Sequence, residues 1–238
     1  MNAVIFGKFP GFGDFLAHGL SPAGARALEG WLESVLPDVK ENFGDNWPAI
    51  WDSAPVLRFW IGPSILDMPL MGLFVPSRDK VGRRYPFIFG LSEIVTPPPL
   101  HVAHDEAVYD YLWSFVSGIQ LPDDPLGGAR ALLDGFVPPK LVGVPWQTGQ
   151  DGTLWGSRDD GDLPRLFREA NQTDADKAQM LRSHWWHGAE SVRSAGWLAA
   201  NGLPDAGAMQ WLLADRVKAP EKQVPITDES DDGKASDD

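Results

Sequence analysis

Three glycines and a lysine follow a short apolar run near the N-terminus, and this combination could bind phosphate. The run Ala3–Phe6 is typical of a strand, and the stretch GKFPGFGDFL begins directly after it at Gly7. A P-loop needs Gly-x-x-x-x-Gly-Lys followed by Ser or Thr, whereas Lys8 precedes the second glycine here. Leu16 stands where the Rossmann pattern Gly-x-Gly-x-x-Gly requires its last glycine. The spacing therefore predicts a tight turn that packs aromatic residues against a sheet, rather than a nucleotide site.

Two histidine pairs could supply ligands to a zinc ion. They are His101-x-x-His104 and His184-x-x-His187, and four imidazoles brought together would suit Zn²⁺ and a metal-dependent hydrolase. Residues three apart in a strand point to opposite faces, however, and we expect residues 182–187 to form a strand. The chain also has no His-Glu-x-x-His arrangement. We therefore predict that no metal and no cofactor is bound.

Other catalytic patterns are equally incomplete. The chain has no cysteine and no Gly-x-Ser-x-Gly elbow for a nucleophile. The acidic stretch Asp159-Asp160-Gly161-Asp162 lacks the spacing and the terminal glutamate of an EF-hand loop. These observations predict a protein that is not an enzyme. A hydrolase that uses the histidine pairs and these acids is the alternative.

The strongest electrostatic feature is a basic cluster between two predicted strands. Four of the chain's 20 basic residues fall within seven positions, at Arg78, Lys80, Arg83 and Arg84. Two interpretations stay open. The arginines could fold back onto carboxylates such as that of Asp14 in bidentate pairs, or the cluster could dock an acidic partner.

Charge and composition exclude several classes of function. The net charge is −13, of which residues 221–238 contribute −5, so both parts of the chain repel polyanions and nucleic-acid binding is not expected. The absence of cysteine fits a compartment without disulfides. We see no signal peptide and no apolar run of about 18 residues that could span a membrane. The expected location is the cytoplasm.

Hydrophobic periodicity predicts an α+β fold. A helix should begin at Ser21-Pro22, bury Leu28 and Leu32, and end at Pro37. Further helices are expected near residues 108–119, 124–133 and 163–170, and after Pro204. Strands are expected at residues 3–7, 56–62, 71–76, 85–91, 182–187 and 195–199, with a brief one at 153–155. These strands should form an antiparallel sheet flanked by helices, similar in general shape to longin-like or profilin-like layered folds.

The domain organisation is predicted from composition. We expect one α+β domain over residues 1–218, in which residues from about 100 onward could form a subdomain that completes the same core. Residues 219–238 are rich in charge and poor in large apolar side chains, so we expect a disordered acidic tail.

Three segments together resemble the TagF (ImpM) family associated with type VI secretion. The first is Gly7-Lys8-Phe9-Pro10 with Gly13-Asp14-Phe15. The second is Ala54-Pro55-Val56-Leu57-Arg58-Phe59, followed by Gly72 to Pro86 with Pro-Ser-Arg-Asp-Lys-Val-Gly-Arg at its centre. The third is Ser183-His184-Trp185-Trp186 with Gly188-Ala189-Glu190 and Gly202-Leu203-Pro204.

The resemblance implies a non-catalytic cytoplasmic accessory protein. Such a protein would restrain type VI secretion after translation by binding a forkhead-associated (Fha) scaffold protein, with a PppA-type phosphatase in the same pathway. A structural component of the secretion apparatus is a further alternative. On this view Asp14 would pair with Arg58, Arg83 or Arg84. The candidate residues for partner binding or for holding the motifs are Lys8, Asp14, Arg58, Arg78, Asp79, Lys80, Arg83, Arg84, Trp185, Trp186 and Glu190.

Overall fold

The computed structural model describes most of the chain up to residue 214. The described residues are 2–93, 96–101, 103–121, 125–141, 159–162, 164–167, 175, 178–189 and 193–214. Glu190, the brief strand expected at 153–155 and the expected acidic tail lie outside them, and so does half of the helix expected at 163–170.

Seven strands form one sheet, and helices connect them. The strands are β1 (Asn2–Gly7), β2 (Leu16–His18), β3 (Leu57–Ile61), β4 (Leu70–Arg78), β5 (Arg84–Ser92), β6 (Arg182–His187) and β7 (Gly196–Asn201). The helices are α1 (Pro22–Phe43), α2 (Trp47–Ser53), α3 (Pro63–Leu66), α4 (Ala107–Ser117) and α6 (Ala206–Leu213), with the 3₁₀ helices η1 (Gly44–Asn46) and η2 (Pro125–Leu133). The short elements β2, α2 and α3 were not predicted from the sequence.

The sheet is antiparallel throughout, as predicted. Its order is β2-β1-β5-β4-β3-β6-β7, and every neighbouring pair is antiparallel. The β4–β5 hairpin lies at its centre and extends from Leu70 opposite Ser92 to Arg78 opposite Arg84. The last two strands, β6 and β7, join the same sheet beside β3.

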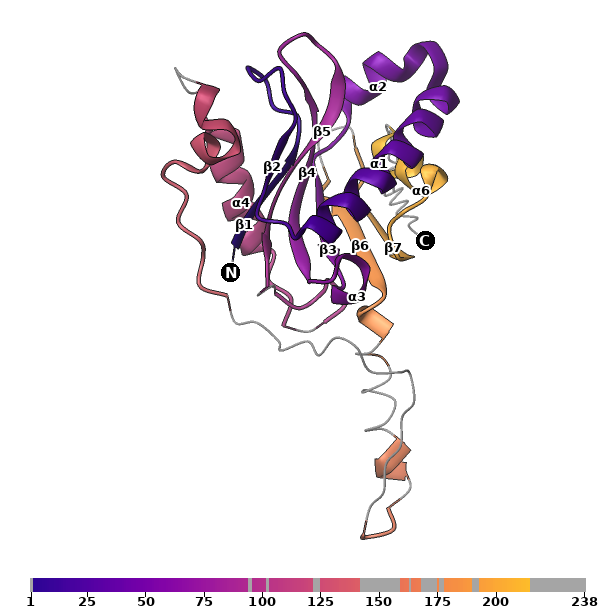
Figure 1. Ribbon diagram of the computed structural model, residues 1–238. Coiled ribbons are helices and arrows are strands. Elements are labelled where there is room, and N and C mark those ends of the chain that lie inside the picture. The colour runs from indigo at the N-terminus through magenta and orange to yellow at the C-terminus, as the bar shows by residue number, and fades with distance from the viewer. Residues whose placement is uncertain are drawn as a thin grey trace, which may run out of the picture.

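Helices cover both faces of this sheet (Figure 1). On one face α1, α2 and α6 enclose a core that includes Leu28, Phe74 and Trp185. On the other face α4 and η2 enclose a second core that includes Trp60, Phe87 and Leu112. The antiparallel layered α+β architecture that the sequence predicted is confirmed.

Helix α1 begins as predicted but does not end where a proline was expected to stop it. The Ser21 hydroxyl accepts a hydrogen bond of 3.0 Å from the Gly24 N–H, which is an N-cap. The helix then continues past Pro37 to Phe43. Pro37 is exposed, and the turn after it buries Val39 completely, so packing of this turn offsets the hydrogen bond that the proline removes.

Tryptophans fix the cores through their indole N–H groups as well as through packing. Trp185 is fully buried and its ring lies 5.2 Å from that of Phe59 and 5.4 Å from that of Trp31. Its indole donates to the Ser183 hydroxyl at 2.9 Å, so the polar atom of this large side chain is satisfied. Trp51 likewise donates to the carbonyl oxygen of Ser77 at 2.9 Å, which ties α2 to β4.

Replacing Trp185 by alanine should destabilise the fold strongly, because it leaves a cavity among the rings of Trp31, Phe59 and Phe74. We expect Trp185→Ala to lower the free energy of unfolding by about 3–5 kcal/mol, measured by urea denaturation followed by circular dichroism. Trp211→Ala removes a tryptophan that is 44% exposed on α6 and should cost about 1 kcal/mol or less. Equal losses in the two variants would contradict the placement of Trp185.

Candidate functional site

The glycine-rich stretch Gly7–Leu16, here called the entry loop, is a turn between β1 and β2. The Phe12 N–H donates to the Phe9 carbonyl at 3.2 Å, with Pro10 and Gly11 between them. Gly11 has a φ of +91°, so proline and glycine occupy the positions that a type II turn favours. The turn predicted from the spacing is confirmed, and its glycine is used for backbone conformation.

Gly7 allows the entry loop to leave the sheet beside β5. Its φ is +114°, and a Cβ atom there would lie 2.0 Å from the carbonyl oxygen of Pro86. The Lys8 N–H can therefore donate to that same oxygen at 3.0 Å. This close approach brings the Lys8 side chain to the end of the β4–β5 hairpin.

Residues Arg78–Arg84, here called the hairpin tip, form a tight turn built around Asp79. The Asp79 N–H donates to the Arg83 carbonyl at 3.0 Å, and the Gly82 N–H donates to the Asp79 carbonyl at 2.9 Å. Gly82 has a φ of +87°, which is typical of a hairpin whose turn ends in a left-handed glycine. The tip of this turn exposes Lys80 and Val81 to solvent.

The Asp79 carboxylate joins the hairpin tip to the entry loop. Its side chain has no exposed surface, and Oδ2 accepts from Lys8 Nζ at 3.0 Å and from Arg83 Nε at 2.5 Å. Oδ1 accepts from the backbone N–H groups of Val81 at 3.0 Å and Arg83 at 2.8 Å. A buried carboxylate that accepts from two cations and two amides is fully satisfied.

These donors control the protonation of Asp79. Burial raises the pKa of its carboxyl, but the hydrogen bonds from Lys8, Arg83 and Val81 outweigh burial and hold that pKa far below its usual range. Two backbone contacts complete the junction. The Lys80 N–H donates to the Phe12 carbonyl at 3.0 Å, and Arg83 Nη2 donates to the Gly13 carbonyl at 3.2 Å.

The two remaining arginines of the hairpin tip share a second carboxylate, that of Asp52 at the end of α2. Arg78 and Arg84 face each other across the hairpin. Asp52 accepts from Arg84 at 2.9 and 2.7 Å and from Arg78 at 3.0 and 2.5 Å. These bidentate contacts, above all the one from Arg84, lower the pKa of Asp52. Asp52 therefore offsets repulsion between like charges on opposite strands.

A third polar cluster lies on the other face, where α4 begins. Arg58 of β3 pairs with Glu106, and its other guanidinium nitrogen lies 2.5 Å from Asp110 Oδ1. Trp186 of β6 faces Arg58 across the strand pair, and its indole donates to Glu106 Oε1 at 2.8 Å. Glu106 carries no motif spacing of its own and was not among the predicted site residues. Its position directly before an amphipathic helix was the signal that could have indicated a role in fixing α4.

Two histidines near this face have opposite electrostatic surroundings. Burial lowers the pKa of His104, but its hydrogen bonds to Glu106 Oε1 (3.1 Å) and to the Pro97 carbonyl (2.9 Å) outweigh burial and raise it. Burial, with a smaller contribution from Arg182, lowers the pKa of His184 to about 4. His184 Nε2 lies 2.7 Å from Gln179 Oε1, and its ring stacks on Trp197.

Asp14 does not hold the arginines together, and this part of the sequence analysis is wrong. Among the residues that the structure describes, Asp14 forms no ion pair and is exposed. Arg58, Arg83 and Arg84 pair instead with Glu106, Asp79 and Asp52, which lie closer to them in the fold.

Apart from Lys80, which is exposed at the hairpin tip, the other described candidate residues fall into four environments. Lys8, Asp79 and Arg83 meet at the junction of the entry loop and the hairpin tip, and Arg78 and Arg84 meet at Asp52. Arg58 and Trp186 meet at Glu106, whereas Trp185 is buried in the opposite core. In the described ranges, no three His, Asp or Glu side chains gather in a way that could hold a metal ion. His184 and His187 lie three apart in β6 and so point to opposite faces.

Comparison with known proteins finds a family model that matches nearly half of the chain. The model of the TagF N-terminal domain, which is type VI secretion system-associated, matches residues 4–116. This match supports the assignment of the chain to the TagF family. The matched segment contains the entry loop, Arg58, the hairpin tip and Glu106, so each of the three polar clusters includes residues from it. The resemblance found in the sequence is confirmed.

One solved structure supports the fold over nearly the whole chain. It is the crystal structure of PA0076 from Pseudomonas aeruginosa PAO1, with a TM-score of 0.67 and 24% sequence identity. The alignment covers 94% of this chain and 100% of that protein. The similarity of fold therefore extends beyond the residues that the TagF N-terminal domain model matches and includes the β6, β7 and α6 segment. Comparison with curated proteins finds no match.

Asp79→Asn should loosen the junction between the entry loop and the hairpin tip. An asparagine amide removes the negative charge and presents an N–H group or a weaker acceptor to Lys8 and Arg83, so we expect the melting temperature to fall by several degrees. Asp14→Asn, an equivalent change on an exposed carboxylate in the same region, should shift it by about 1–2 °C or less.

The effect of Asp79→Asn should also depend on pH in a defined direction. The folded pKa of Asp79 lies below the unfolded value of about 4, so its stabilising contribution is complete above that value and is lost as pH falls below it. The difference in melting temperature between wild type and variant should therefore shrink below about pH 4. A difference that stays constant down to pH 2.5 would contradict the role of the carboxylate.

Nuclear magnetic resonance titration should separate the two histidines. We expect His184 to stay neutral until the pH approaches about 4, and His104 to titrate above the ordinary value of 6.5. His104→Gln and His184→Gln variants would assign the resonances. Titration of both rings near pH 6.5 would show that the contacts of His104 and the burial of His184 do not persist in solution.

Proposed function

We propose that this protein is a non-catalytic cytoplasmic accessory protein that restrains type VI secretion after translation by binding an Fha-type scaffold protein. The family match supports the association with type VI secretion. A PppA-type phosphatase would act in the same pathway. In the described part of the chain, no helix has both the length and the apolar composition that crossing a membrane requires.

One observation favours a protein-binding function over a catalytic one. The polar residues of the motifs that resemble the TagF family pair with one another and stabilise the fold. They support a rigid turn, the hairpin tip, which faces solvent. Lys8 and Arg83 both donate to the buried Asp79 carboxylate. The turn that they support exposes Lys80 and Val81, and the Val81 side chain is 72% exposed. A rigid projection with an apolar and a cationic side chain suits docking to a protein, because little entropy is lost when it binds.

Reversing the charge at the tip tests this proposal. We expect Lys80→Glu combined with Val81→Asp to abolish co-purification of the Fha-type scaffold with the full chain and to raise type VI secretion in cells. The two side chains make no ion pair or aromatic contact within the described residues, so the melting temperature should stay unchanged.

The control is Arg26→Glu, a charge reversal on the exposed side of α1 that lowers the net charge by two units, against three for the tip variant. It should leave both co-purification and secretion as in wild type. Wild-type binding by the tip variant would refute docking through the hairpin tip. Loss of secretion when the whole protein is deleted would instead indicate a structural component of the apparatus.

A further inference from the structure

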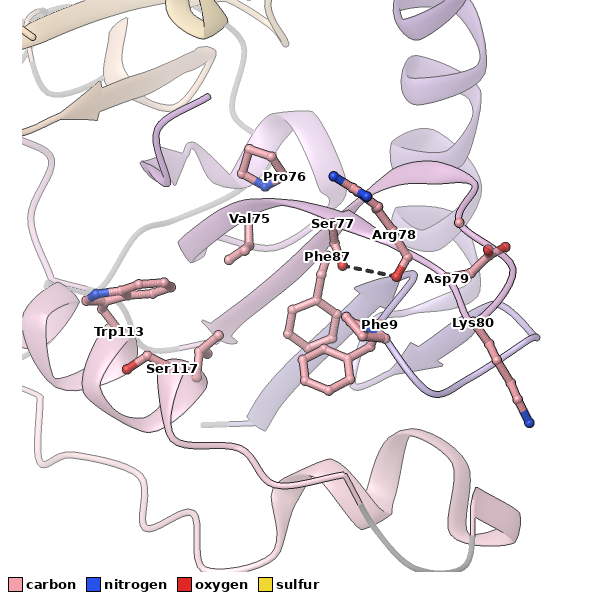
Figure 2. Close-up of a pocket in the computed structure, with 13 residues that line it drawn as sticks. Phe9, Val75, Pro76, Ser77, Arg78, Asp79, Lys80, Phe87, Trp113 and Ser117 are labelled. Carbon is pink, nitrogen blue, oxygen red and sulfur yellow. Dashed lines mark hydrogen bonds between the residues drawn. The ribbon is translucent and has the colours of Figure 1, made fainter. Parts of the chain in front are cut away.

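An apolar groove lies directly beside the hairpin tip. It has a volume of about 560 Å³, and the entry loop, the end of the β4–β5 hairpin and α4 enclose it. Figure 2 shows Phe9 and Phe87 between Trp113 of α4 and Lys80 at the tip. The volume lies within the range of about 300–1,000 Å³ that is common for ligand sites.

The floor of this groove is rigid and its α4 wall is available to a ligand. The rings of Phe9 and Phe87 lie 4.8 Å apart, and the turn after Phe9 is fixed by its hydrogen bond from Phe12. Trp113 is 40% exposed, and none of the described residues accepts a hydrogen bond from its indole N–H. A half-exposed tryptophan of this kind can cover an apolar side chain and donate to a backbone carbonyl.

The side of the groove next to the hairpin tip is positively charged, although the chain carries −13. The entry loop and the tip contribute five cations, and three carboxylates lie among them. The cations are Lys8, Arg78, Lys80, Arg83 and Arg84, and the carboxylates are Asp14, Asp52 and Asp79. Two positive charges therefore remain uncompensated. This net charge is accessible. Lys80 extends into solvent away from the aromatic floor (Figure 2), and the Arg83 side chain is 61% exposed although it also donates to Asp79.

We propose that the groove binds an extended acidic segment of the partner protein, with one apolar side chain of that segment against Trp113. The apolar floor selects the buried side chain, and Lys80 with Arg83 selects flanking carboxylates. This inference rests on the proposed function, because it identifies the kind of segment that the partner presents to the same end of the molecule.

Binding of the purified Fha-type scaffold to the full chain tests the groove separately from the function. We expect Trp113→Ala to raise the dissociation constant by about tenfold or more, as for a central aromatic contact, in calorimetry at 0.1 M salt. Trp211→Ala removes a tryptophan of similar exposure (44%) on the opposite face and should leave the constant unchanged. Ser117→Trp, which fills the groove from α4 without removing packing, should weaken binding as Trp113→Ala does. Melting curves show that each variant is folded.

Photo-crosslinking identifies the occupant. With p-benzoyl-phenylalanine in place of Trp113, we expect crosslinks to an acidic segment of the scaffold, and with the same group in place of Trp211 we expect none. Crosslinks to residues 219–238 of this chain or of a second copy, or to a segment without acidic residues, would overturn the proposal. So would binding to phosphatidylglycerol vesicles that depends on Trp113 while scaffold binding does not.

The outcomes distinguish the two proposals. If the scaffold binds wild type and both groove variants with equal affinity, the groove assignment is refuted and the proposed function stands. If the scaffold does not bind wild type at all, both are refuted.

Discussion

The buried carboxylate of Asp79 is the constraint on which one whole end of the molecule depends. Removing a charge from water costs several kcal/mol, so a carboxylate without exposed surface persists only where donors surround it. One donor, Lys8 in the entry loop, lies 71 residues before Asp79 in the chain, and the other donors belong to the turn that ends at Arg83. The entry loop therefore cannot move away from the hairpin tip without taking the Lys8 ammonium away from this buried charge. The conformation of Gly7, which allows the close approach to Pro86, serves the same contact from the backbone side.

Helix α4, which forms the opposite wall of the groove, is fixed by a second carboxylate, that of Glu106, which is not buried as Asp79 is. Glu106 is half-exposed, and it accepts from Trp186 and pairs with Arg58 and His104. Its three partners come from β6, β3 and the segment before α4, so the helix is held against the sheet at its first turn. The remaining turns are held by apolar packing of Leu112 and Val116. Both walls of the groove are thus positioned by side-chain contacts with long sequence separation, and a ligand would meet a preformed surface, which reduces the ordering cost of binding.

The sequence allowed the sheet to be predicted but not most of the ion pairs. Alternating apolar and β-branched runs located β1, β3, β4, β5, β6 and β7, and the Ser21-Pro22 signal located the start of α1, because these features depend on local residue order. The three-residue β2 is too short for a period, and α1 continues past Pro37 because tertiary packing of Val39 outweighs a local signal. Asp52 lies 26 and 32 positions before the arginines it binds, so nothing local indicated it. Asp79 was different, since an aspartate that accepts from the N–H two residues later is a familiar turn pattern and could have been preferred over Asp14.

The chain carries a net charge of −13, but the end of the molecule formed by the entry loop and the hairpin tip is basic. This charge distribution affects how a partner approaches the protein. At physiological ionic strength the Debye length is about 8 Å, so charges on distant helices are largely screened from a segment that touches the hairpin tip. Within that distance the cations of the entry loop and the hairpin tip outnumber the carboxylates by five to three, and the side chains of Lys80 and Arg83 are exposed to solvent. An acidic segment is therefore repelled weakly by most of the surface and attracted at one end, which favours a single orientation of encounter. The paired carboxylates of Asp52 and Asp79 leave an excess of three positive charges, which the exposed Asp14 reduces to two. This net positive charge at one end of the molecule makes the attraction specific to position and sensitive to salt.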